Sequence, residues 1–475
     1  MADSQGAQRR LKVDRVAVIG AGACGLAAAR YLQAEQAFSL IQVFDQRPVA
    51  GGLWNYTPLE GEDVNQDVDG PHTTPSATLE SPMRIVSPVY DLLETNIPHT
   101  LMNYAEQPFP EKSALFPKHV VVKEYLQQCA EPVQALLSLE TQVSKVTKTD
   151  SGWTVDTRHL PSGTTSTIPF DAVIVANGHY SDPFVPDIKG LSTFAEQHPD
   201  VVTHAKFYRR AETFADKKVI VVGNSASGID ISAQIATVCR GPVLVSEKEK
   251  DTSTVNPIAA TAEPSSTIRQ IPEIIEFLAN TRSVRLSDGT VENDIDAVVF
   301  CTGYLYTFPF LAEKCTSPDG SFVPGLYDHL LRADDPTLAF LGIPQRVVPF
   351  PVAEAQSAWV ARLYSGRCPL PSKEELVATT LEGRGAHNMG FPKDVAYINK
   401  LYDRSLRAER DDRLVHDGIG KIPPYWGPEQ AWTRERFPAI KVAFRNLGEE
   451  REHVERLGQL GFDFNAWQRE QGEIE

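Results

Sequence analysis

The stretch Val16-Ala-Val-Ile-Gly20-Ala-Gly22-Ala-Cys-Gly25 decides the fold of this chain. An apolar run typical of a buried strand ends in a GxGxxG turn, and the helix-like segment 26–32 follows. Glycine lets the backbone approach a pyrophosphate closely, and the N-terminus of the next helix favours negative charge. The stretch therefore predicts a strand, a phosphate-binding turn and a helix.

An acidic residue completes this first unit. The strand-like Ile41-Gln-Val-Phe-Asp45 follows the helix, and Asp45 lies about 20 residues beyond the last glycine, where an acid commonly holds a ribose hydroxyl. We expect Gly20, Gly22, Gly25 and Asp45 to bind a dinucleotide. Flavin adenine dinucleotide (FAD) is favoured, because such proteins usually place the flavin unit at the N-terminus.

A second stretch of the same kind is Val219-Ile-Val-Val-Gly223-Asn-Ser225-Ala-Ser-Gly228, followed by the helix-like 229–235. Ser225 replaces the middle glycine, yet serine still permits close backbone approach and offers a hydroxyl to phosphate. The residues expected to bind here are Gly223, Ser225, Ala226, Ser227 and Gly228. Two such loops predict two dinucleotides, a flavin and the nicotinamide that reduces it.

The strand after the second loop ends in Val245-Ser-Glu247-Lys248-Glu-Lys250. Glu247 would accept from a ribose 2′-hydroxyl, as for NAD, whereas Lys248 and Lys250 would hold the extra phosphate of NADP. A solvated charge run is the plain alternative. These residues by themselves leave NAD and NADP open.

The composition and the net charge exclude several classes of protein. The 475 residues, 42% hydrophobic and 23% charged, are typical of a soluble globular protein too long for one core. The net charge of −16 argues against nucleic-acid binding. No apolar run reaches the roughly 18 residues of a membrane-spanning helix, and the C-terminal stretch 432–475 is charged. We expect a cytoplasmic protein without a membrane anchor.

The cysteines carry no recognisable chemistry. None of the six lies in a CxxC or in a cysteine–histidine cluster, which argues against disulfides, zinc and a dithiol reductase. We expect most of them to be buried, inert core residues. The sequence also offers no recognisable Ser–His–Asp set or carboxylate pair, so a bound cofactor is expected to carry the chemistry.

The order of the patterns predicts an α/β fold in which a large domain is interrupted by a smaller one. A hairpin-like region after Gly152 precedes the buried strand 171–179, and the chain then crosses through the proline-rich 182–187. After the second unit and the strand 295–303, it crosses back through Phe308-Pro-Phe310. We predict two Rossmann-like domains, the nicotinamide domain being inserted in the FAD domain. The predicted boundaries are 1–180 and 309–475 for the FAD domain and 181–308 for the insertion.

The remaining segments give coarser expectations. The stretch 60–82 is rich in Asp, Gly, Pro, Ser and Thr and reads as a long surface loop. A strand is expected over 338–343 and a helix over 353–365. Apolar residues recur at helical spacing in 440–445 and 454–460, which predicts a C-terminal helical segment with its stripe toward the core.

From about Val16 to Pro371 the chain resembles the flavin-containing monooxygenases, class B flavoprotein monooxygenases. The order and spacing of several pieces carry the resemblance beside the two loops: Gly51-Gly52-Leu53-Trp54, Tyr90-Asp-Leu-Leu-Glu-Thr95-Asn96, Phe109-Pro-x5-Phe116-Pro117, His204-Ala-Lys-Phe-Tyr208, Cys301-Thr-Gly-Tyr304 with Phe308-Pro-Phe310, and Phe350-Pro-x2-Glu354-Ala-Gln356-x2-Trp359-Val-Ala-Arg362.

The chain departs from the pattern of the family in three places. The FxGxxxH signature is not intact, because Phe194 lies ten residues before His204 with no glycine between them. Asp45 stands where the family usually has a glutamate. The tail lacks the anchor of the microsomal members, so the chain looks like the soluble, yeast-type branch.

The resemblance implies roles for individual residues. Gly52, Leu53 and Trp54 would line the flavin, Gln356 would approach its ring system, and Val143 belongs to the same cofactor-binding set. Asn96 matches the asparagine near the reactive flavin carbon, where it would be the catalytic residue that positions nicotinamide and oxygen. A turn-forming asparagine before Pro98 is the alternative.

For the nicotinamide, Lys248 matches the family's basic residue for the 2′-phosphate, which favours NADPH over NADH. His204 and Tyr208 would lie at the nicotinamide side. A structural histidine with satisfied hydrogen bonds is the alternative for His204.

The implied activity is oxygenation of a nucleophilic heteroatom. NADPH would reduce FAD, O2 would form a C4a-hydroperoxide, and a small-molecule nitrogen or sulfur would attack it, with an amine or alkaloid nitrogen favoured over a sulfide. Baeyer–Villiger oxygenation and ornithine-type N-hydroxylation fit less well, because Tyr208-Arg209 replaces Trp-Pro and Phe308-Pro309 replaces His-Pro. A nucleotide-sensing flavoprotein without turnover is the remote alternative. A homodimer is common in the family.

Overall fold

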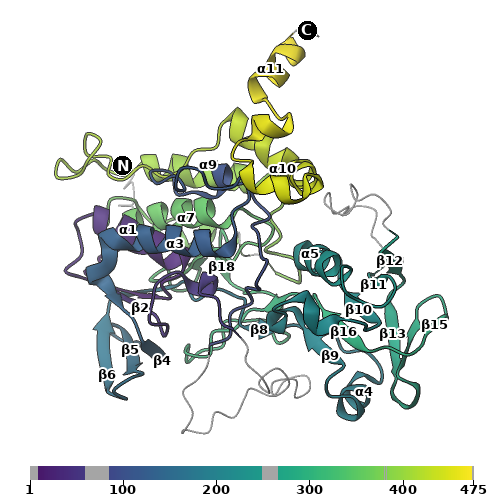
Figure 1. Ribbon diagram of the computed structural model, residues 1–475. Coiled ribbons are helices and arrows are strands. Elements are labelled where there is room, and N and C mark those ends of the chain that lie inside the picture. Colours follow the sequence, from purple (N-terminus) through teal and green to yellow (C-terminus); the bar gives the residue numbers. More distant parts are fainter. Residues whose placement is uncertain (1–8, 59–84, 249–265, 379, 381, 473–475) are drawn as a thin grey trace.

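The computed structural model describes residues 9–58, 85–248, 266–378, 380 and 382–472 (Figure 1). The surface loop expected over 60–82 and the side chain of Lys250 lie outside these ranges. Within them, no helix combines the length and the apolar character needed to cross a membrane.

A seven-stranded sheet forms the centre of the larger domain. Its strands lie in the order β18 (Leu326–Tyr327), β19 (Leu331–Arg332), β20 (Leu338–Phe340), β7 (Ala172–Val175), β1 (Arg15–Ile19), β2 (Leu40–Phe44) and β3 (Leu137–Ser138). The pairs from β20 to β3 are parallel, and the edge pairs β18–β19 and β19–β20 are antiparallel. This is the doubly wound arrangement in which a dinucleotide binds at the carboxyl ends of the strands.

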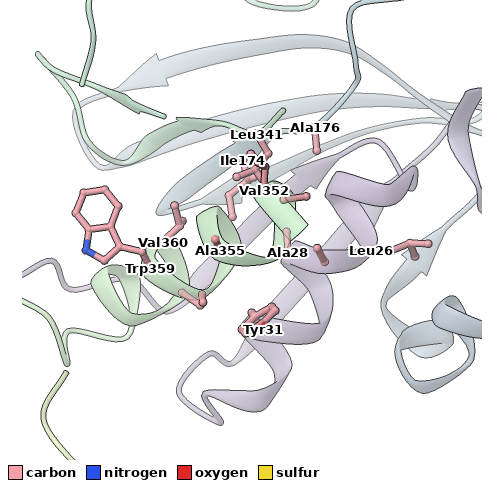
Figure 2. Packing of buried hydrophobic residues seen from close by; sticks show 14 of the residues in the cluster. Leu26, Ala28, Tyr31, Ile174, Ala176, Leu341, Val352, Ala355, Trp359 and Val360 are labelled. Carbon is pink, nitrogen blue, oxygen red and sulfur yellow. The ribbon is translucent and has the colours of Figure 1, made fainter. Parts of the chain in front are cut away.

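Two helices pack side by side on one face of this sheet. They are α1 (Ala23–Ala34) and α7 (Pro349–Tyr364), and Figure 2 shows Ala28 facing Ala355 between them. Small residues at the contact let the two backbones approach. Helix α7 is buried from Phe350 to Tyr364, which explains why the expected helix over 353–365 has apolar residues on every side. It begins four residues earlier than expected, at a proline suited to the first helical turn.

The other face of the sheet is covered by a three-stranded antiparallel sheet of β4 (Thr141–Thr149), β5 (Gly152–His159) and β6 (Thr165–Phe170). The hairpin expected after Gly152 is confirmed by the β5–β6 pairing. Buried side chains from both sheets, including Phe44, Val155 and Phe340, form one apolar cluster.

A second, five-stranded sheet is entirely parallel. Its order is β12 (Ile268–Ile271), β11 (Val243–Ser246), β10 (Val219–Val222), β16 (Ala297–Phe300) and β9 (Val202–His204). Helix α5 (Ala226–Ile235) follows β10. All five strands lie in the chain between β7 and β18 of the first sheet, so the insertion of one Rossmann-like domain into the other is confirmed.

The two crossings between the sheets run next to each other. Strand β8 (Asp182–Pro183) pairs antiparallel with β17 (Tyr304–Leu305). Both strands fall close to the predicted domain boundaries, which we retain as a proposal.

The remaining elements connect or cover these sheets. They are η1 (Gly52–Trp54), α2 (His99–Met102), α3 (His119–Ala130), η3 (Glu131–Leu136), α4 (Leu191–Gln197), η4 (Ala205–Phe207), η5 (Ala211–Phe214), β13 (Ile274–Leu278), η6 (Ala279–Thr281), β14 (Ser283–Leu286), β15 (Val291–Glu292), α8 (Lys373–Ala378) and α9 (Lys393–Leu406).

The C-terminal segment contains α10 (Pro428–Asn446), η7 (Gly448–His453), η8 (Leu457–Leu460) and α11 (Phe464–Gly472). The helix expected over 440–445 is confirmed as part of α10. Of the helix expected over 454–460, only Leu457–Leu460 is helical, as the 3-10 helix η8. Val454 is extended, and its carbonyl oxygen accepts a 2.6 Å hydrogen bond from the Leu115 amide. This bond to a distant segment replaces the local helical bond. Val454, Leu457 and Leu460 pack in an apolar cluster, so the stripe toward the core is confirmed.

Candidate functional site

The first glycine turn is held in a geometry that only glycine permits. Gly20 has φ +107°, and a Cβ there would lie 2.5 Å from the Ala176 carbonyl oxygen. A Cβ on Gly25 would lie 1.7 Å from the Gly20 carbonyl oxygen, because the first turn of α1 rests directly on the loop. The glycines therefore bring α1 against the end of β1, with its unpaired N–H groups facing outward.

The segment Gly51–Trp54 lies against the middle of this turn. A Cβ on Gly52 would lie 2.8 Å from the Gly22 Cα, so the two backbones pack in contact. Gly22 begins α1, and the Gly51 amide donates to the Ala21 carbonyl oxygen at 2.9 Å. The predicted flavin residues Gly52, Leu53 and Trp54 thus adjoin the pyrophosphate loop.

The second turn repeats the geometry of the first. Gly223 has φ +102°, with a Cβ position 2.7 Å from the Cys301 carbonyl oxygen, and a Cβ on Gly228 would lie 1.9 Å from the Gly223 carbonyl oxygen. Ser225 has φ −104° and ψ −167°, an extended conformation open to any residue, and its side chain is exposed. The departure from glycine at Ser225 therefore costs the loop nothing. Ala226 and Ser227 begin the helix.

Asp45 reinforces the first turn from the end of β2. Its carboxylate accepts hydrogen bonds from the backbone amides of Ala21 at 2.7 Å and Arg47 at 2.8 Å. Burial raises the pKa of this carboxyl, and the two amides oppose that shift. Asp45 thus fixes the loop, and its contact with a ribose hydroxyl remains a prediction.

Asn96 lies half-buried in the turn before α2. Within the described residues its side chain makes no hydrogen bond, although a turn-forming asparagine would be expected to bond its own backbone. The neighbouring Thr95 hydroxyl closes the turn instead, donating to the Ile97 carbonyl oxygen at 2.9 Å. The Asn96 amide is therefore available to a ligand.

Gln356 is completely buried in α7. Its Oε1 accepts from the Gly342 amide and its Nε2 donates to the Tyr397 hydroxyl, both at 3.0 Å. The side chain fastens the turn after β20 to α9. Its approach to the flavin ring remains a prediction, as does the cofactor contact of Val143, a half-buried residue of β4 that packs on the apolar cluster.

His204 and Tyr208 are buried and bonded within the protein. The His204 Nδ1 accepts from the Lys206 amide, so its Nε2 carries the proton and donates to the Gly303 carbonyl oxygen, both at 3.1 Å. Burial lowers the pKa of His204 to about 4. The Tyr208 hydroxyl donates to Gln234 Oε1 at 3.0 Å. These bonds match the structural alternative for His204.

Lys248 follows β11 and is exposed, with its Nζ 3.5 Å from a Glu273 carboxylate oxygen. This loose contact leaves the ammonium accessible to a phosphate, and its role toward NADPH stays a prediction.

Arg209 follows the predicted nicotinamide residue Tyr208, and its contacts were not expected from the sequence. It is buried and donates to the carbonyl oxygens of Thr57 at 2.8 Å and Ser87 at 2.9 Å. These bonds tie the inserted domain to the chain that follows the flavin-lining segment. A single arginine leaves no periodic pattern in a sequence, so nothing in the sequence predicted that its side chain joins the two domains.

The cysteines are free in the structure, and four of the six are buried. Burial raises the pKa of Cys24 and Cys301, which adjoin the two glycine turns, to about 12. At neutral pH these thiols stay protonated, so neither serves as a thiolate nucleophile.

Two family models match the chain between residues 18 and 398. Residues 79–264 and 264–398 match the family described as flavin-binding monooxygenase-like. Residues 18–87 match the NAD(P)-binding Rossmann-like domain.

Two curated relatives cover most of the chain. Flavin-containing monooxygenase FMO GS-OX-like 4 of Arabidopsis thaliana is 34% identical over 80% of this chain and 85% of its own length. Thiol-specific monooxygenase of Saccharomyces cerevisiae is 32% identical over 84% of this chain and 90% of its own length. Among solved structures, S-allyl-L-cysteine S-oxygenase from Allium sativum has a TM-score of 0.73 and 27% identity over 98% of this chain and 100% of its own.

The packing of α1 on its loop predicts the effect of Gly25→Ala. The added methyl would lie 1.7 Å from the Gly20 carbonyl oxygen, so helix and turn must separate. Overpacking of this kind costs about 3 kcal/mol or more. We expect a lower unfolding temperature and FAD lost on purification. Gly458→Ala, which enters open space, is the control. Wild-type FAD content in Gly25→Ala would contradict the assignment of this loop.

The second loop is tested by a pair of variants at Ser225. Ser225→Glu places a negative charge at the start of α5 and should raise the Michaelis constant for NADPH by repelling its phosphates. Ser225→Gly should change that constant far less, because it adds no charge and removes only one hydroxyl. Steady-state kinetics at saturating O2 measure both. Equal constants for the two variants would exclude this loop from the nicotinamide site.

Proposed function

The chain belongs to the flavin-binding monooxygenase-like family, and from this premise we propose that it oxygenates the sulfur atom of a small molecule. It is an NADPH-dependent flavin monooxygenase with FAD and NADPH as cofactors. The observation that carries the sulfur assignment is the match over nearly the whole chain to an S-allyl-L-cysteine S-oxygenase. The thiol-specific monooxygenase among the relatives adds support.

The chemistry of the nucleophile also favours sulfur. An alkyl amine, with a pKa of about 10, must lose a proton before its lone pair can react, whereas a thioether has a lone pair available at any pH. His204, the histidine expected near the nicotinamide, is locked as a neutral donor by its two hydrogen bonds. It therefore cannot take the proton of an ammonium substrate.

The two carboxylates that precede Asn96 in the sequence are already paired with cations. Glu94 lies 3.4 Å from Lys441 and 3.0 Å from Arg451. Asp91 lies 3.5 Å from the guanidinium of Arg210. Neither offers an unpaired charge to attract a cationic amine. The nitrogen preference expected from the resemblance thus finds no support in these residues, and we propose sulfur in its place.

When bound, FAD would supply an acceptor for the hydride of NADPH and the means to activate O2, so that thioether, O2, NADPH and one proton would give sulfoxide, NADP+ and water. The chain's own residues bind, orient and exclude water. The two glycine turns hold the pyrophosphates, and Asp45 fixes the first of them. The Asn96 amide, a neutral donor and acceptor, orients oxygen and nicotinamide beside the flavin.

The role of Asn96 is tested by Asn96→Ser. We expect the variant to keep its FAD and to consume NADPH, but to release more hydrogen peroxide and less oxygenated product, because the shorter hydroxyl no longer reaches the ligand. Product and peroxide per NADPH measure the effect. Asn446→Ser, at an exposed position, is the control. Unchanged product per NADPH in Asn96→Ser would make Asn96 an ordinary turn residue.

The substrate class is tested with a panel of thioethers, thiols, tertiary amines and ketones. NADPH consumption is followed together with the mass of each product. We expect thioethers to give sulfoxides, one oxygen atom heavier, in amounts close to the NADPH consumed. N-oxides from amines with no product from thioethers or thiols would contradict the assignment.

A further inference from the structure

We propose that helix α10 positions the reacting groups: its Lys441 holds the backbone of the Asn96 turn, and its Arg445 holds helix α5 beside the second glycine loop. The proposal rests on the function proposed above for Asn96. Figure 1 shows α10 lying over the junction between α5 and the helices of the larger domain. The match to the family model ends at residue 398, before this helix begins.

Lys441 reaches the Asn96 turn from the interior of the protein. Its side chain is 1% exposed, and its Nζ donates to the Thr95 carbonyl oxygen at 2.8 Å. That carbonyl belongs to the peptide bond that Thr95 shares with Asn96. The hydrogen bond therefore fixes the peptide plane from which the Asn96 side chain projects.

The surroundings of the ammonium group keep it in one place. Glu94 lies 3.4 Å away, and the Phe116 and Phe444 rings lie with their centroids 4.4 Å and 5.2 Å from the Nζ. Burial lowers the pKa of Lys441 to about 8. A buried ammonium is costly unless each neighbour compensates for the lost water, so the side chain has little freedom to move.

The segment after α10 holds the same turn at further points. Arg451 pairs with Glu94 at 3.0 Å, and the Leu115 amide donates to the Val454 carbonyl oxygen at 2.6 Å. The side chains of Ile440, Phe444 and Val454 complete a small apolar cluster with Leu115 and Phe116. The C-terminal segment is thus anchored next to the turn at Glu94, and to the chain at Leu115.

Arg445 lies one helical turn after Lys441 and contacts the inserted domain. Its Nη2 lies 2.7 Å from Asp230 Oδ1 on α5, and the Tyr90 hydroxyl donates to Asp230 Oδ2 at 2.5 Å. Gln234 Nε2 also donates to Asp230 at 3.0 Å. Asp230 is thereby joined through Tyr90 to the segment that leads to Asn96, and through Arg445 to α10.

Residues four positions apart on a helix lie on the same face, about 5–6 Å from each other. Because Lys441 holds the Asn96 turn and Arg445 holds α5, the rigid helix sets the distance between Asn96 and the NADPH loop. Misplacement of reacting groups by about 1 Å can cost roughly a hundredfold in rate. Release of this helix should therefore favour loss of peroxide over oxygen transfer.

The experiment compares Lys441→Met with the wild type. Methionine keeps the apolar stem between the two phenylalanine rings and removes the donor to Thr95. With NADPH and O2 but without an oxygenation substrate, we expect peroxide release per bound FAD to rise several-fold while the Michaelis constant for NADPH stays unchanged. Lys118→Met is the control, because it removes only an exposed ion pair with Glu452 in the same C-terminal segment.

Glu94→Gln is the second variant and keeps the shape of the side chain. It removes the carboxylate that pairs with Lys441, so a smaller rise in peroxide release is expected. If Lys441→Met does not fold, the peroxide release of Glu94→Gln tests the positioning role instead. Wild-type peroxide release per bound FAD in the folded variants, even with a lower unfolding temperature, would overturn the positioning role.

This measurement is separate from the test of the proposed function. Peroxide release without substrate does not depend on which heteroatom is oxygenated. Failure of the proposed sulfur oxygenation would appear in the wild-type product, whereas failure of the positioning role would appear as equal peroxide release in wild type and variants.

Discussion

The close packing of a helix on the turn that precedes it is the constraint on which this structure depends. Gly25 and Gly228 occupy the same position in the two domains, and a side chain at either would lie within 2 Å of a backbone carbonyl oxygen. Only glycine permits this approach, and the approach places the N-termini of α1 and α5 at the ends of β1 and β10. A helix N-terminus placed in this way favours a bound phosphate, which is the basis of the two cofactor sites that we predict.

A monooxygenase must also hold its two cofactors in register, and the glycine turns alone cannot do this. The paired crossings β8 and β17 join the domains on one side, and α10 joins them on another through Asp230. Arg209 adds a third tie between the inserted domain and the chain after the flavin-lining segment. These polar contacts between domains, rather than either Rossmann-like sheet, would set how close the nicotinamide comes to Asn96.

The features that depend on local sterics could be predicted from the sequence. The glycine turns, the insertion of one domain in the other and the hairpin after Gly152 were predictable because glycine spacing and apolar runs act over short ranges. Of the helix expected over 454–460, only Leu457–Leu460 is helical, because Val454 bonds to the distant Leu115. Lys441 was invisible in the sequence, since a lone lysine in a helix looks exposed until its tertiary neighbours are known.

Transfer of one oxygen atom of O2 to sulfur, with NADPH as the reductant, is the reaction that we propose for this chain. It is tested by the mass of the product formed from a thioether under isotopically labelled O2, together with the NADPH consumed. We expect one labelled oxygen in each sulfoxide and close to one sulfoxide per NADPH. A product without the label, or NADPH consumed with only peroxide formed, would contradict it.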